Sequence, residues 1–522
     1  MTEFRTFDGT DNHRQHPLRG AANTPLLRRT KVGYEDGVST LARRGEANPN
    51  PRAISNLVCA QKTLHPNEAG LSDFVWAWGQ FLDHELDLTE AVPGEVADIT
   101  VEPSDPVLPE GGLVEFQRSI HDPATGTGPD NPRQQINQIS AYIDATNVYG
   151  ASVLRSSALR CFDGTGKLRT TPSPNGDLLP YNIPQFPNAG GSRSDFFLAG
   201  DVRANEHVVL TSMHTLFVRE HNRRCDQILA LEPELDDESV FQRARRIVIG
   251  MMQAITFEEF LPAILGDHGP KAYNGYDETV DPGIENLFST ACYRLGHSML
   301  SPDIAVGRSG RTISLREAFF RPRWVERNGI DTLLDGLSSK VMQELDTRAV
   351  DDVRNFFFSK PDPIQRRIGD LAALNIQRGR DHGLPGYNQC RRDFGLAPCA
   401  SFAEVTSDRD LRETLEDLYE SVEDIDPWIG GLAEDHAPGA QVGEFFATVI
   451  RDQFERVRDG DRFWYQNDLG LSPTEKQEIQ RTRLSDVIRR NTSLHSVPDD
   501  VFHAPASCGN GQREEDREIE LV

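Results

Sequence analysis

The 522-residue sequence has few cysteines, no long hydrophobic run and a shortage of basic residues. Its seven cysteines show no CxxC spacing, which argues against a zinc-finger or disulfide-stapled protein. Because no run of about 18 apolar residues occurs, no membrane span is predicted. The first residues, MTEFRTFDGTDNHRQHP, lack the basic and then apolar pattern of a signal peptide, so no standard secretion signal is expected.

The charge balance is strongly acidic. Asp and Glu number 81 against 55 Lys and Arg, which gives a formal net charge of −26. A field of this sign repels phosphate backbones and anionic lipids, so nucleic acid is not an expected partner. Hydrophobic residues make up 37% of the chain and 42 glycines add to them, close to the apolar content of ordinary globular proteins. Wholesale disorder is therefore excluded.

The cysteines are expected to be mostly buried thiols, because cysteine behaves as a small hydrophobic residue in protein interiors. Cys390 and Cys399 are close enough in sequence to close a small disulfide loop, which is the less favoured interpretation. The odd number leaves at least one cysteine unpaired if the others bond within the chain.

Helical periodicity dominates the sequence. From Asp73, apolar residues at three- and four-residue spacing predict an amphipathic helix in DFVWAWGQFLDHEL. Residues 91–130, rich in Pro, Gly and Asp, are expected to form a long loop. Strand signals are short and sparse, so we expect a mainly α fold with long loops and few short strands. Further helices are predicted near 206–231, 238–262, 284–298, 331–346, 408–422 and 440–456.

The chain is predicted to form one large domain, because no change of composition marks a linker. Residues 1–50 show no sustained periodicity and are expected to form an irregular arm wrapped on the body. Residues 51–507 would form the catalytic domain. Residues 508–522 are charged and poor in apolar residues, so they are expected to be a mobile tail.

One segment, WGQFLDHELDLTE at 78–90, places polar groups on an apolar helix. Gln80, His84 and Asp87 share one helical face. A zinc-protease motif is excluded, because HExxH would need histidine where the sequence has Leu88. The plain structural alternative is a buried histidine whose hydrogen bonds are satisfied within the core.

Three further segments carry candidate groups. GDVRANEHVVL places Arg203 and Glu206 at the mouth of a helix, a spacing that is also typical of an exposed ion pair. CYRLGHSML carries His297 beside a glycine that would let a large flat group approach. LNIQRGRDHGLPGYN holds Asn375 before a Gly/Pro turn. Each signal is weak by itself.

Together the four segments resemble those of the animal-type haem peroxidase superfamily, which includes the leukocyte, lactating-gland and thyroid peroxidases and peroxidasin. The resemblance runs from RTFDGT near Thr6 to VPDDVFHAP near residue 505. It implies a single helical haem peroxidase domain that binds haem b. It further implies that hydrogen peroxide is reduced through a ferryl intermediate, with oxidation of small donors such as halides, thiocyanate and phenols. Relatives are mostly secreted or extracytoplasmic.

On the distal side of the haem, the resemblance assigns the peroxide chemistry. His84 matches the distal histidine and Arg203 the distal arginine. A neutral imidazole takes and returns a proton, and a guanidinium stabilises developing negative charge, which together suit cleavage of the O–O bond. Gln80 is similar to the family glutamine that binds pocket water or a halide.

On the proximal side, His297 resembles the iron ligand. Asn375 matches the residue that accepts a hydrogen bond from the other ring nitrogen, and a neutral amide leaves the imidazole less electron-rich than a carboxylate would. The resemblance therefore implies a high-potential oxidant. Arg294 and Arg378 occupy positions that pair haem propionates, although a surface ion pair is the alternative for each.

Two carboxylates, Asp83 and Glu206, match the residues that form ester bonds to haem methyl groups in this family. His207 stands where the leukocyte peroxidase has a methionine bonded to haem through sulfur. We expect this third linkage to be absent, which weakens the case for efficient chloride oxidation.

The segment SAYIDAT at 140–146 resembles the family's calcium loop. Ser140, Asp144 and Thr146 would offer side-chain oxygens and Tyr142 its carbonyl, and oxygen ligands suit Ca²⁺. Glu85 stands where the family usually has the aspartate that completes the site. We expect its longer side chain to reach the calcium ion, or Asp87 to help to bind it. The alternative is a polar loop held by its own hydrogen bonds.

Two other functions are compatible with the same resemblance. Fatty-acid oxygenases of the same fold use a tyrosyl radical three residues before the proximal histidine, but that position is Arg294 here, and Tyr293 is offset by about 100° on a helix. A catalytically silent adhesion module is disfavoured, because every catalytic position matches.

Overall fold

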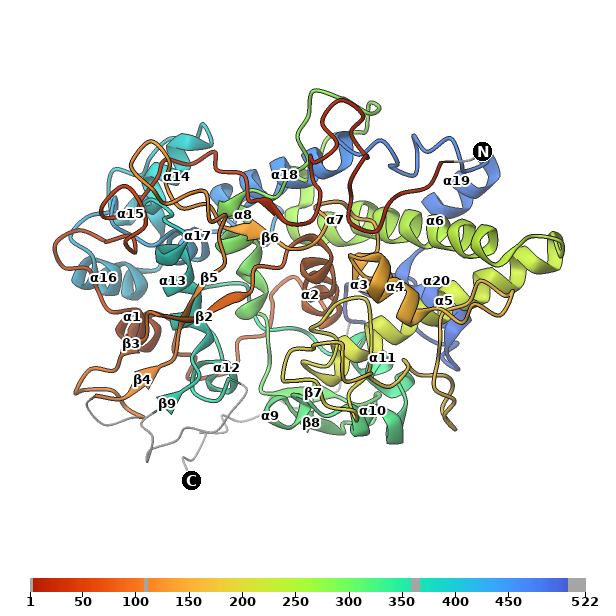
Figure 1. Cartoon of the computed structure of the whole chain (residues 1–522). Helices are drawn as coiled ribbons and strands as arrows, with labels where there is room; N and C mark the ends of the chain where they lie inside the picture. The colour runs from red at the N-terminus through yellow and green to blue at the C-terminus, as the bar shows by residue number, and fades with distance from the viewer. Residues whose placement is uncertain (1–2, 108–110, 358–366, 506–522) are drawn as a thin grey trace.

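A computed structural model describes residues 3–107, 111–357 and 367–505 (Figure 1). The fold is mainly α, as predicted from the sequence, and the predicted tail at 508–522 lies outside the described residues. Its α-helices are α1 Pro51–Val58, α2 Phe74–Leu86, α3 Thr146–Tyr149, α4 Val153–Leu159, α5 Val208–Leu231, α6 Asp237–Ile255, α7 Leu261–Leu265, α8 Asn286–Thr290, α9 Leu315–Ala318, α10 Pro322–Asn328, α11 Asp331–Leu337, α12 Asp351–Arg354, α13 Leu371–Asp381, α14 Tyr387–Asp393, α15 Phe402–Val405, α16 Arg409–Leu418, α17 Pro427–Ala433, α18 Glu444–Asp459, α19 Pro473–Arg481 and α20 Leu484–Asn491.

Helix α2 lies at the centre of the molecule, beside the long helix α5 (Figure 1). It begins after Asp73, as the periodicity predicted, and its apolar residues are almost fully buried. Trp78 and Phe81 pack with Phe217 of α5, where the rings of Phe81 and Phe217 stack at 5.3 Å between centroids. Burial of large aromatic side chains at about 25 cal/mol per Å² fixes this helix against its neighbour. The polar residues of α2 are thereby held in fixed directions.

Helix α6 continues through a π-helical turn, η1 (Thr256–Phe260), into α7. Within the described residues, the helical stretch Asp237–His268 is the one long and apolar enough to cross a membrane. Its apolar window, however, is 72% buried inside the protein, as in the core helix of a globular domain.

The strands are short and form small separate sheets. The 91–130 segment, expected to be a loop, contains four of them, which pair in antiparallel fashion within that region. The strands are β1 Thr24–Pro25, β2 Ala91–Val96, β3 Ile99–Thr100, β4 Leu113–Val114, β5 Gln117–Ser119, β6 Ile136–Asn137, β7 Asp303–Ala305, β8 Thr312–Ser314 and β9 Arg367–Ile368, in the orders β1-β6, β2-β5, β3-β4-β9 and β7-β8.

Two predicted helices differ from the structure. The run at 284–298 is divided into α8 and a 3₁₀ helix, η3 (Cys292–His297), because Ala291 adopts φ −129° and ψ −64°. The tighter winding of η3 directs Arg294 and His297 to the same region, since 3₁₀ side chains three residues apart lie on one face. The run at 331–346 is helical only in α11, which ends at Leu337.

The N-terminal segment lies across the helices α6 and α18 (Figure 1). Arg5 pairs with the buried carboxylate of Asp461, and Arg29 pairs with Asp452 of α18. Strand β1 pairs with β6, with Thr24 opposite Asn137. The segment is thus attached to the body by ion pairs and a strand.

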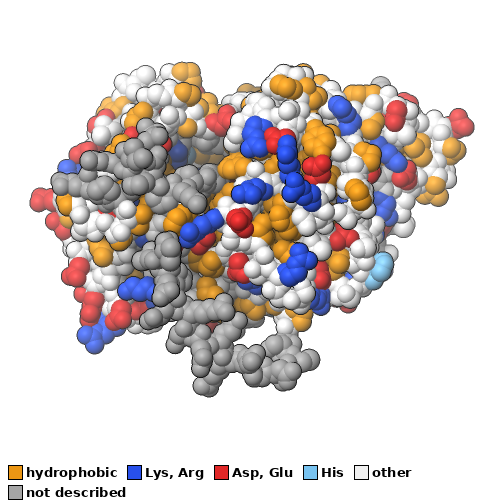
Figure 2. Space-filling view, turned by 90° about the horizontal axis from the view of Figure 1, so that it is seen from below, with side chains coloured by type: hydrophobic (Ala, Val, Ile, Leu, Met, Phe, Trp, Pro, Cys, Tyr) orange, Lys and Arg blue, Asp and Glu red, His pale blue; other side chains and the backbone are white. Residues whose placement is uncertain are grey.

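The surface carries acidic, basic and hydrophobic side chains. On the face seen from below, basic side chains gather near the middle beside hydrophobic and acidic ones, so the excess of acidic groups is not evenly spread (Figure 2).

Among the described residues, six cysteines are free thiols, including Cys390 and Cys399. The disulfide between these two is therefore not formed in the structure, and both are buried, as the favoured interpretation expected.

Candidate active site

A cavity of about 390 Å³ lies among α2, the turn before α5, η3 and α13. Apolar side chains such as Trp76, Phe260 and Leu374 share its wall with many polar ones. All nine residues that the sequence assigned to a haem site line this one cavity: Gln80, Asp83, His84, Arg203, Glu206, Arg294, His297, Asn375 and Arg378.

His84 lies on α2 with its ring buried at the cavity wall. Its Nδ1 is 3.7 Å from Asp201 Oδ1 and has no hydrogen-bond partner among the described residues. Burial lowers the pKa of His84 well below its usual value of 6.5, and the nearby charge of Arg203 lowers it further. The ring is therefore neutral near neutral pH and is able to accept a proton.

Arg203 is held by Asp201. Its Nε and Nη2 each donate to the Asp201 carboxylate at 2.9 Å, and its backbone N–H donates at 2.7 Å. Nη2 also donates to the main-chain oxygen of Asp87 at 2.9 Å. Although burial favours a neutral Asp201, the charge of Arg203 holds the pKa of Asp201 well below its usual range. A bidentate pair of this kind fixes the direction of the guanidinium.

Gln80 bridges Glu206 and His207. Its Nε2 donates to Glu206 Oε2 at 3.2 Å, and its Oε1 lies 2.7 Å from His207 Nε2. His207 Nδ1 accepts from the backbone N–H of Leu210 and caps α5, so Nε2 carries the ring hydrogen. Burial raises the pKa of Glu206 to about 7 and lowers that of His207 to about 3. Both groups are uncharged over much of the acidic pH range.

Asp83 and Asp87 lie one helical turn apart on α2 and both line the cavity. Asp83 Oδ2 is 3.9 Å from Arg203 Nη1. Burial, and then the neighbouring carboxylate of Asp87, raise the pKa of Asp83 well above its usual value. Asp87 thus lines the cavity, away from the 140–147 segment where the other residues expected to bind calcium lie.

His297 ends η3, and its Nδ1 lies 2.7 Å from Asn375 Nδ2 on α13. Asn375 Oδ1 accepts instead from Arg294 Nη1 at 3.2 Å. The expected pair is thus in contact, but the amide nitrogen rather than the oxygen faces the ring, because Arg294 occupies the oxygen. Burial lowers the pKa of His297 to about 3, with the charge of Arg294 acting in the same direction. The second ring nitrogen, Nε2, has no hydrogen bond to the described residues.

Arg378 on α13 belongs to a buried polar network. Its Nη1 donates to Ser119 Oγ at 2.8 Å and to Asp381 Oδ2 at 3.0 Å. Ser119 Oγ in turn lies 2.7 Å from His382 Nε2. Burial lowers the pKa of Arg378 to about 10, which leaves it cationic and able to bind an anion that enters the cavity.

The residues expected to bind calcium lie outside the cavity, where the 140–147 segment meets Glu85 of α2. Glu85 accepts hydrogen bonds from the backbone N–H groups of Asp144, Ala145 and Asn147. Ser140 Oγ donates to Asp144 Oδ2 at 2.8 Å. Hydrogen-bond donors occupy both oxygens of Glu85 and Oδ2 of Asp144, while Oδ1 of Asp144 has no partner among the described residues. The N–H groups around Glu85 suit an anion and do not fit a calcium ion.

The structure adds three groups to the site that had no predicted role. Asp201 lies in the turn before α5, Ser119 ends strand β5, and His382 follows α13. The acid two residues before Arg203 was the one available signal, because an Asx turn at i and i+2 is common before a helix.

The comparisons with known proteins agree with this geometry. The family model of animal haem peroxidases matches residues 4–502. The chain is 36% identical to human eosinophil peroxidase, covering 96% of this chain and 77% of that protein. It is 35% identical to peroxinectin A of Dictyostelium discoideum, with 96% of each covered. Against thyroid peroxidase of Sus scrofa the identity is 33%, covering 96% of this chain and 60% of that protein.

Solved structures show the same fold. Peroxidase A of Dictyostelium discoideum superposes with a TM-score of 0.88 at 33% identity, covering 96% of this chain and all of that one. A fatty acid alpha-dioxygenase of Oryza sativa superposes with a TM-score of 0.78 at 21% identity, covering 96% and 88%, and this likeness concerns the fold alone.

The buried His84 with Arg203 beside it and the half-buried His297 line one cavity, an arrangement that suits a haem enzyme that acts on peroxide. The chain belongs to the animal haem peroxidase family, and its cofactor is haem.

Proposed function

We propose that this chain reduces hydrogen peroxide in the cavity below α2 and oxidises small electron donors there. When bound, haem supplies the redox chemistry for both half-reactions. The residues present fit haem. Two neutral histidines line one cavity, and Nε2 of His297 has no hydrogen bond to the described residues. Two arginines of the same cavity would bind the haem carboxylates. The observation that carries the proposal is the contact of one buried carboxylate, Asp201, with both His84 and Arg203.

On the distal side, His84 takes a proton from the bound peroxide and returns it to the departing oxygen. The lowered pKa of His84 supports this role, because only the neutral ring accepts a proton. Arg203 stabilises the negative charge that develops as the O–O bond breaks. Asp201 keeps the guanidinium in place, and Gln80 orders water or a small anion in the pocket.

On the proximal side, His297 would hold the haem iron, since its Nε2 has no hydrogen bond to the described residues. Nδ1 would then carry the ring hydrogen, and the amide oxygen of Asn375 would be its acceptor in place of Arg294. Arg294 and Arg378, which line the same cavity, would pair with the haem propionates.

Asp83 and Glu206 are the groups that we propose would form ester bonds to haem methyl groups: each carboxyl oxygen would replace one hydrogen of a methyl group, with hydrogen peroxide as the two-electron oxidant that is reduced to water. Their raised pKa values support this, because uncharged carboxyl groups are stable in an apolar pocket next to the haem edge. His207 cannot provide a sulfur linkage, and its ring is committed to Gln80 and to the cap of α5.

The proposed donors are bromide, iodide, thiocyanate and phenols. With at most two linkages to the haem, chloride is expected to be a poor donor. The test is the optical spectrum of the haem-loaded protein before and after one equivalent of hydrogen peroxide, followed by a screen of these donors. Slow bleaching without a rapid spectral change contradicts the proposal.

Fatty-acid oxygenation is not favoured by the site. Tyr293 does line the cavity, because 3₁₀ winding differs from the α-helix that the sequence suggested, and its ring stacks on Phe288. Arg294, however, occupies the position of the radical tyrosine. Oxygen uptake with palmitate as the added substrate is expected to stay at the background rate.

A further inference from the structure

The loop at 140–147 is closed by the side chain of Glu85. Oε1 accepts from the backbone N–H of Asp144 at 2.6 Å and from that of Ala145. Oε2 accepts from the backbone N–H of Asn147 at 3.0 Å. The hydroxyl of Thr146 lies 3.3 Å from Oε2 and 3.3 Å from the main-chain oxygen of Glu85. One carboxylate thus meets four donors from four consecutive residues.

These contacts use the lone pairs that a metal would need. The two oxygens of a carboxyl group offer about four acceptor sites, and four donors surround those of Glu85. The backbone itself is shaped for an anion: Ala145 adopts a left-handed conformation, with φ 62° and ψ 34°, which turns successive N–H groups toward one point. Such concave arrangements of N–H groups bind anions, whereas a calcium ion requires oxygens pointing inward.

The other expected ligands do not compensate. Calcium takes about six to eight oxygen ligands. The hydroxyl of Ser140 donates to Asp144 Oδ2 at 2.8 Å, and its oxygen accepts from the backbone N–H of Tyr142 at 3.2 Å. Asp144 Oδ1 is the one carboxylate oxygen of this group without a partner among the described residues. Asp87, which was also considered as a calcium ligand, lines the cavity instead.

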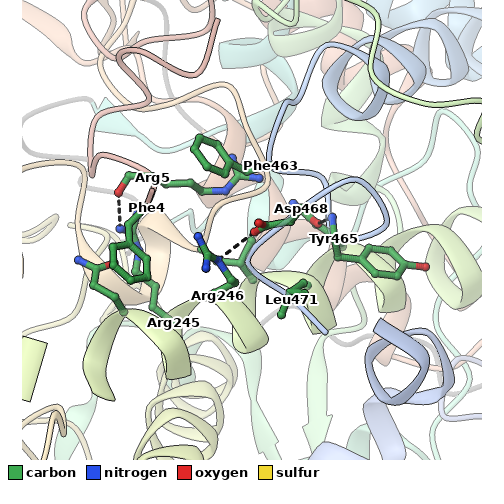
Figure 3. A pocket seen from close by; sticks show the side chains of 12 residues that line it. Phe4, Arg5, Arg245, Arg246, Phe463, Tyr465, Asp468 and Leu471 are labelled. Atoms are coloured by element: carbon green, nitrogen blue, oxygen red, sulfur yellow. Dashed lines mark hydrogen bonds and ion pairs between the residues drawn. The ribbon is translucent and has the colours of Figure 1, made fainter. Parts of the chain in front are cut away.

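Positive charge near the loop comes from two arginines. Arg5 lies over the ring of Tyr142 at 5.9 Å, and Arg245 of α6 lies over that of Tyr149 at 5.7 Å. Figure 3 shows the Arg245 side chain reaching the main-chain oxygen of Arg5, to which Nη1 donates a hydrogen bond of 2.9 Å. Burial raises the pKa of Asp144 to about 6, and the charges of Arg5 and Arg245 oppose this shift. Burial, and then the neighbouring carboxyl group of Asp144, raise the pKa of Glu85 well above its usual range.

Neighbouring contacts anchor the closed loop to three elements. Asn147 Nδ2 donates to the main-chain oxygen of Phe81 on α2 at 2.8 Å, and Gln253 Nε2 on α6 donates to that of Ile143 at 2.8 Å. Gly200 packs so tightly on this segment that a Cβ there would lie 2.4 Å from the main-chain oxygen of Thr146. The loop thereby supports both α2 and the turn that carries Asp201.

We propose that the carboxylate of Glu85 closes the 140–147 loop in place of a divalent cation, so that this protein folds and holds its distal site without calcium. The extra methylene of glutamate, compared with aspartate, carries the carboxylate into the ring of N–H groups. A shorter side chain at this position would leave that space open.

The first experiment uses the haem-loaded protein with its natural sequence. Purified without added calcium and dialysed against EGTA, it is expected to hold far less than one calcium per chain by elemental analysis. Its unfolding temperature should be the same in EGTA and in millimolar CaCl₂. One tightly held calcium per chain, or a clear fall in unfolding temperature in EGTA, overturns the proposal.

The second experiment compares substitutions at position 85. Glu85→Asp should lower the unfolding temperature by several degrees in EGTA, because the shorter carboxylate loses N–H contacts. Glu85→Gln should lower it without any response to calcium, because the amide places an N–H group against the N–H groups of the loop. Glu234→Asp, at an exposed position, is the matched control and should change nothing.

The effect of calcium on the unfolding temperature of Glu85→Asp is the more specific test of the role of Glu85. We expect added calcium to raise its unfolding temperature, since the shortened side chain opens room for the cation. An unfolding temperature equal to that of the natural sequence in EGTA contradicts the proposed role of Glu85. If the substituted chains fail to fold, the elemental analysis and the EGTA comparison on the natural sequence decide alone.

Discussion

Asp201 holds the guanidinium of Arg203 through two hydrogen bonds of 2.9 Å. The same carboxylate lies 3.7 Å from Nδ1 of His84. A single buried anion thus positions the two side chains that we propose act on peroxide. Its negative charge also opposes the lowering of the His84 pKa by burial.

Replacing Asp201 by asparagine is expected to slow the reaction with hydrogen peroxide by about 10- to 100-fold, as for other residues that orient an active-site group. The amide removes the charge and puts a donor where Arg203 needs an acceptor. Stopped-flow spectroscopy of the haem-loaded protein measures the rate. Haem content should stay unchanged, and Asp130→Asn, at an exposed position, is the matched control. An unchanged rate would show that Asp201 does not position Arg203.

His84→Ala is expected to slow the same reaction more strongly, by about 10² to 10⁴, because general acid–base catalysis is lost. Haem should remain bound, since His297 rather than His84 is the proposed ligand. The rate and the haem content are measured on the same preparation. A variant that reacts as fast as the natural sequence would refute the distal role of His84.

The pH dependence of the peroxide reaction follows from the pKa of His84. Only the neutral ring accepts a proton, and burial lowers its pKa well below 6.5. The rate constant should therefore be constant above pH 6.5 and fall only as the pH drops well below that value. Asp201→Asn should move the fall to still lower pH, because the charge of Asp201 raises the pKa of His84. A half-point at or above pH 6.5 in the natural sequence would contradict the neutral, buried ring.

The sequence predicted the parts of this fold that have strong local signals. Helix α2 begins after Asp73 because its apolar spacing is regular and its residues are buried on almost every side. The predicted helix at 284–298 is wrong, because the chain breaks at Ala291, where neither Gly nor Pro signals the break in the sequence. Propensity reports local preference, and tertiary contacts override it.

In the site, too, the residues that lie in recognisable motifs were predicted, and those whose role depends on tertiary contacts were not. His84, Arg203 and His297 were found through motifs, and the structure places them in one cavity. Asp201 was missed, because a carboxylate in a turn has an ordinary structural explanation. The contacts of Glu85 were also beyond the sequence: whether a longer acid reaches a metal or a ring of N–H groups depends on the left-handed backbone at Ala145.

Asn375→Asp tests the proximal side. A carboxylate near Nδ1 of His297 makes the imidazole more electron-rich, which stabilises the ferric state. The ferric/ferrous reduction potential of the haem-loaded protein is therefore expected to fall, as measured by spectroelectrochemistry. The control is Asn375→Ala, which removes the hydrogen-bond partner without adding charge and should not lower the potential, because the imidazole loses the acceptor that makes it more electron-rich. Equal potentials in all three proteins would mean that Asn375 does not tune the iron ligand.

The ester linkages are tested by denaturing extraction of haem after exposure to peroxide. In the natural sequence the haem should stay with the chain, because Asp83 and Glu206 each contribute one bond. Glu206→Gln removes the carboxyl oxygen that would form the ester but preserves the shape of the side chain beside Gln80. It should leave one linkage, as should Asp83→Asn, and the double substitution should release the haem entirely. Mass spectrometry of haem-bearing peptides counts the bonds: two linkages in Glu206→Gln would exclude this residue, and haem retained by the double variant would require a different attachment site.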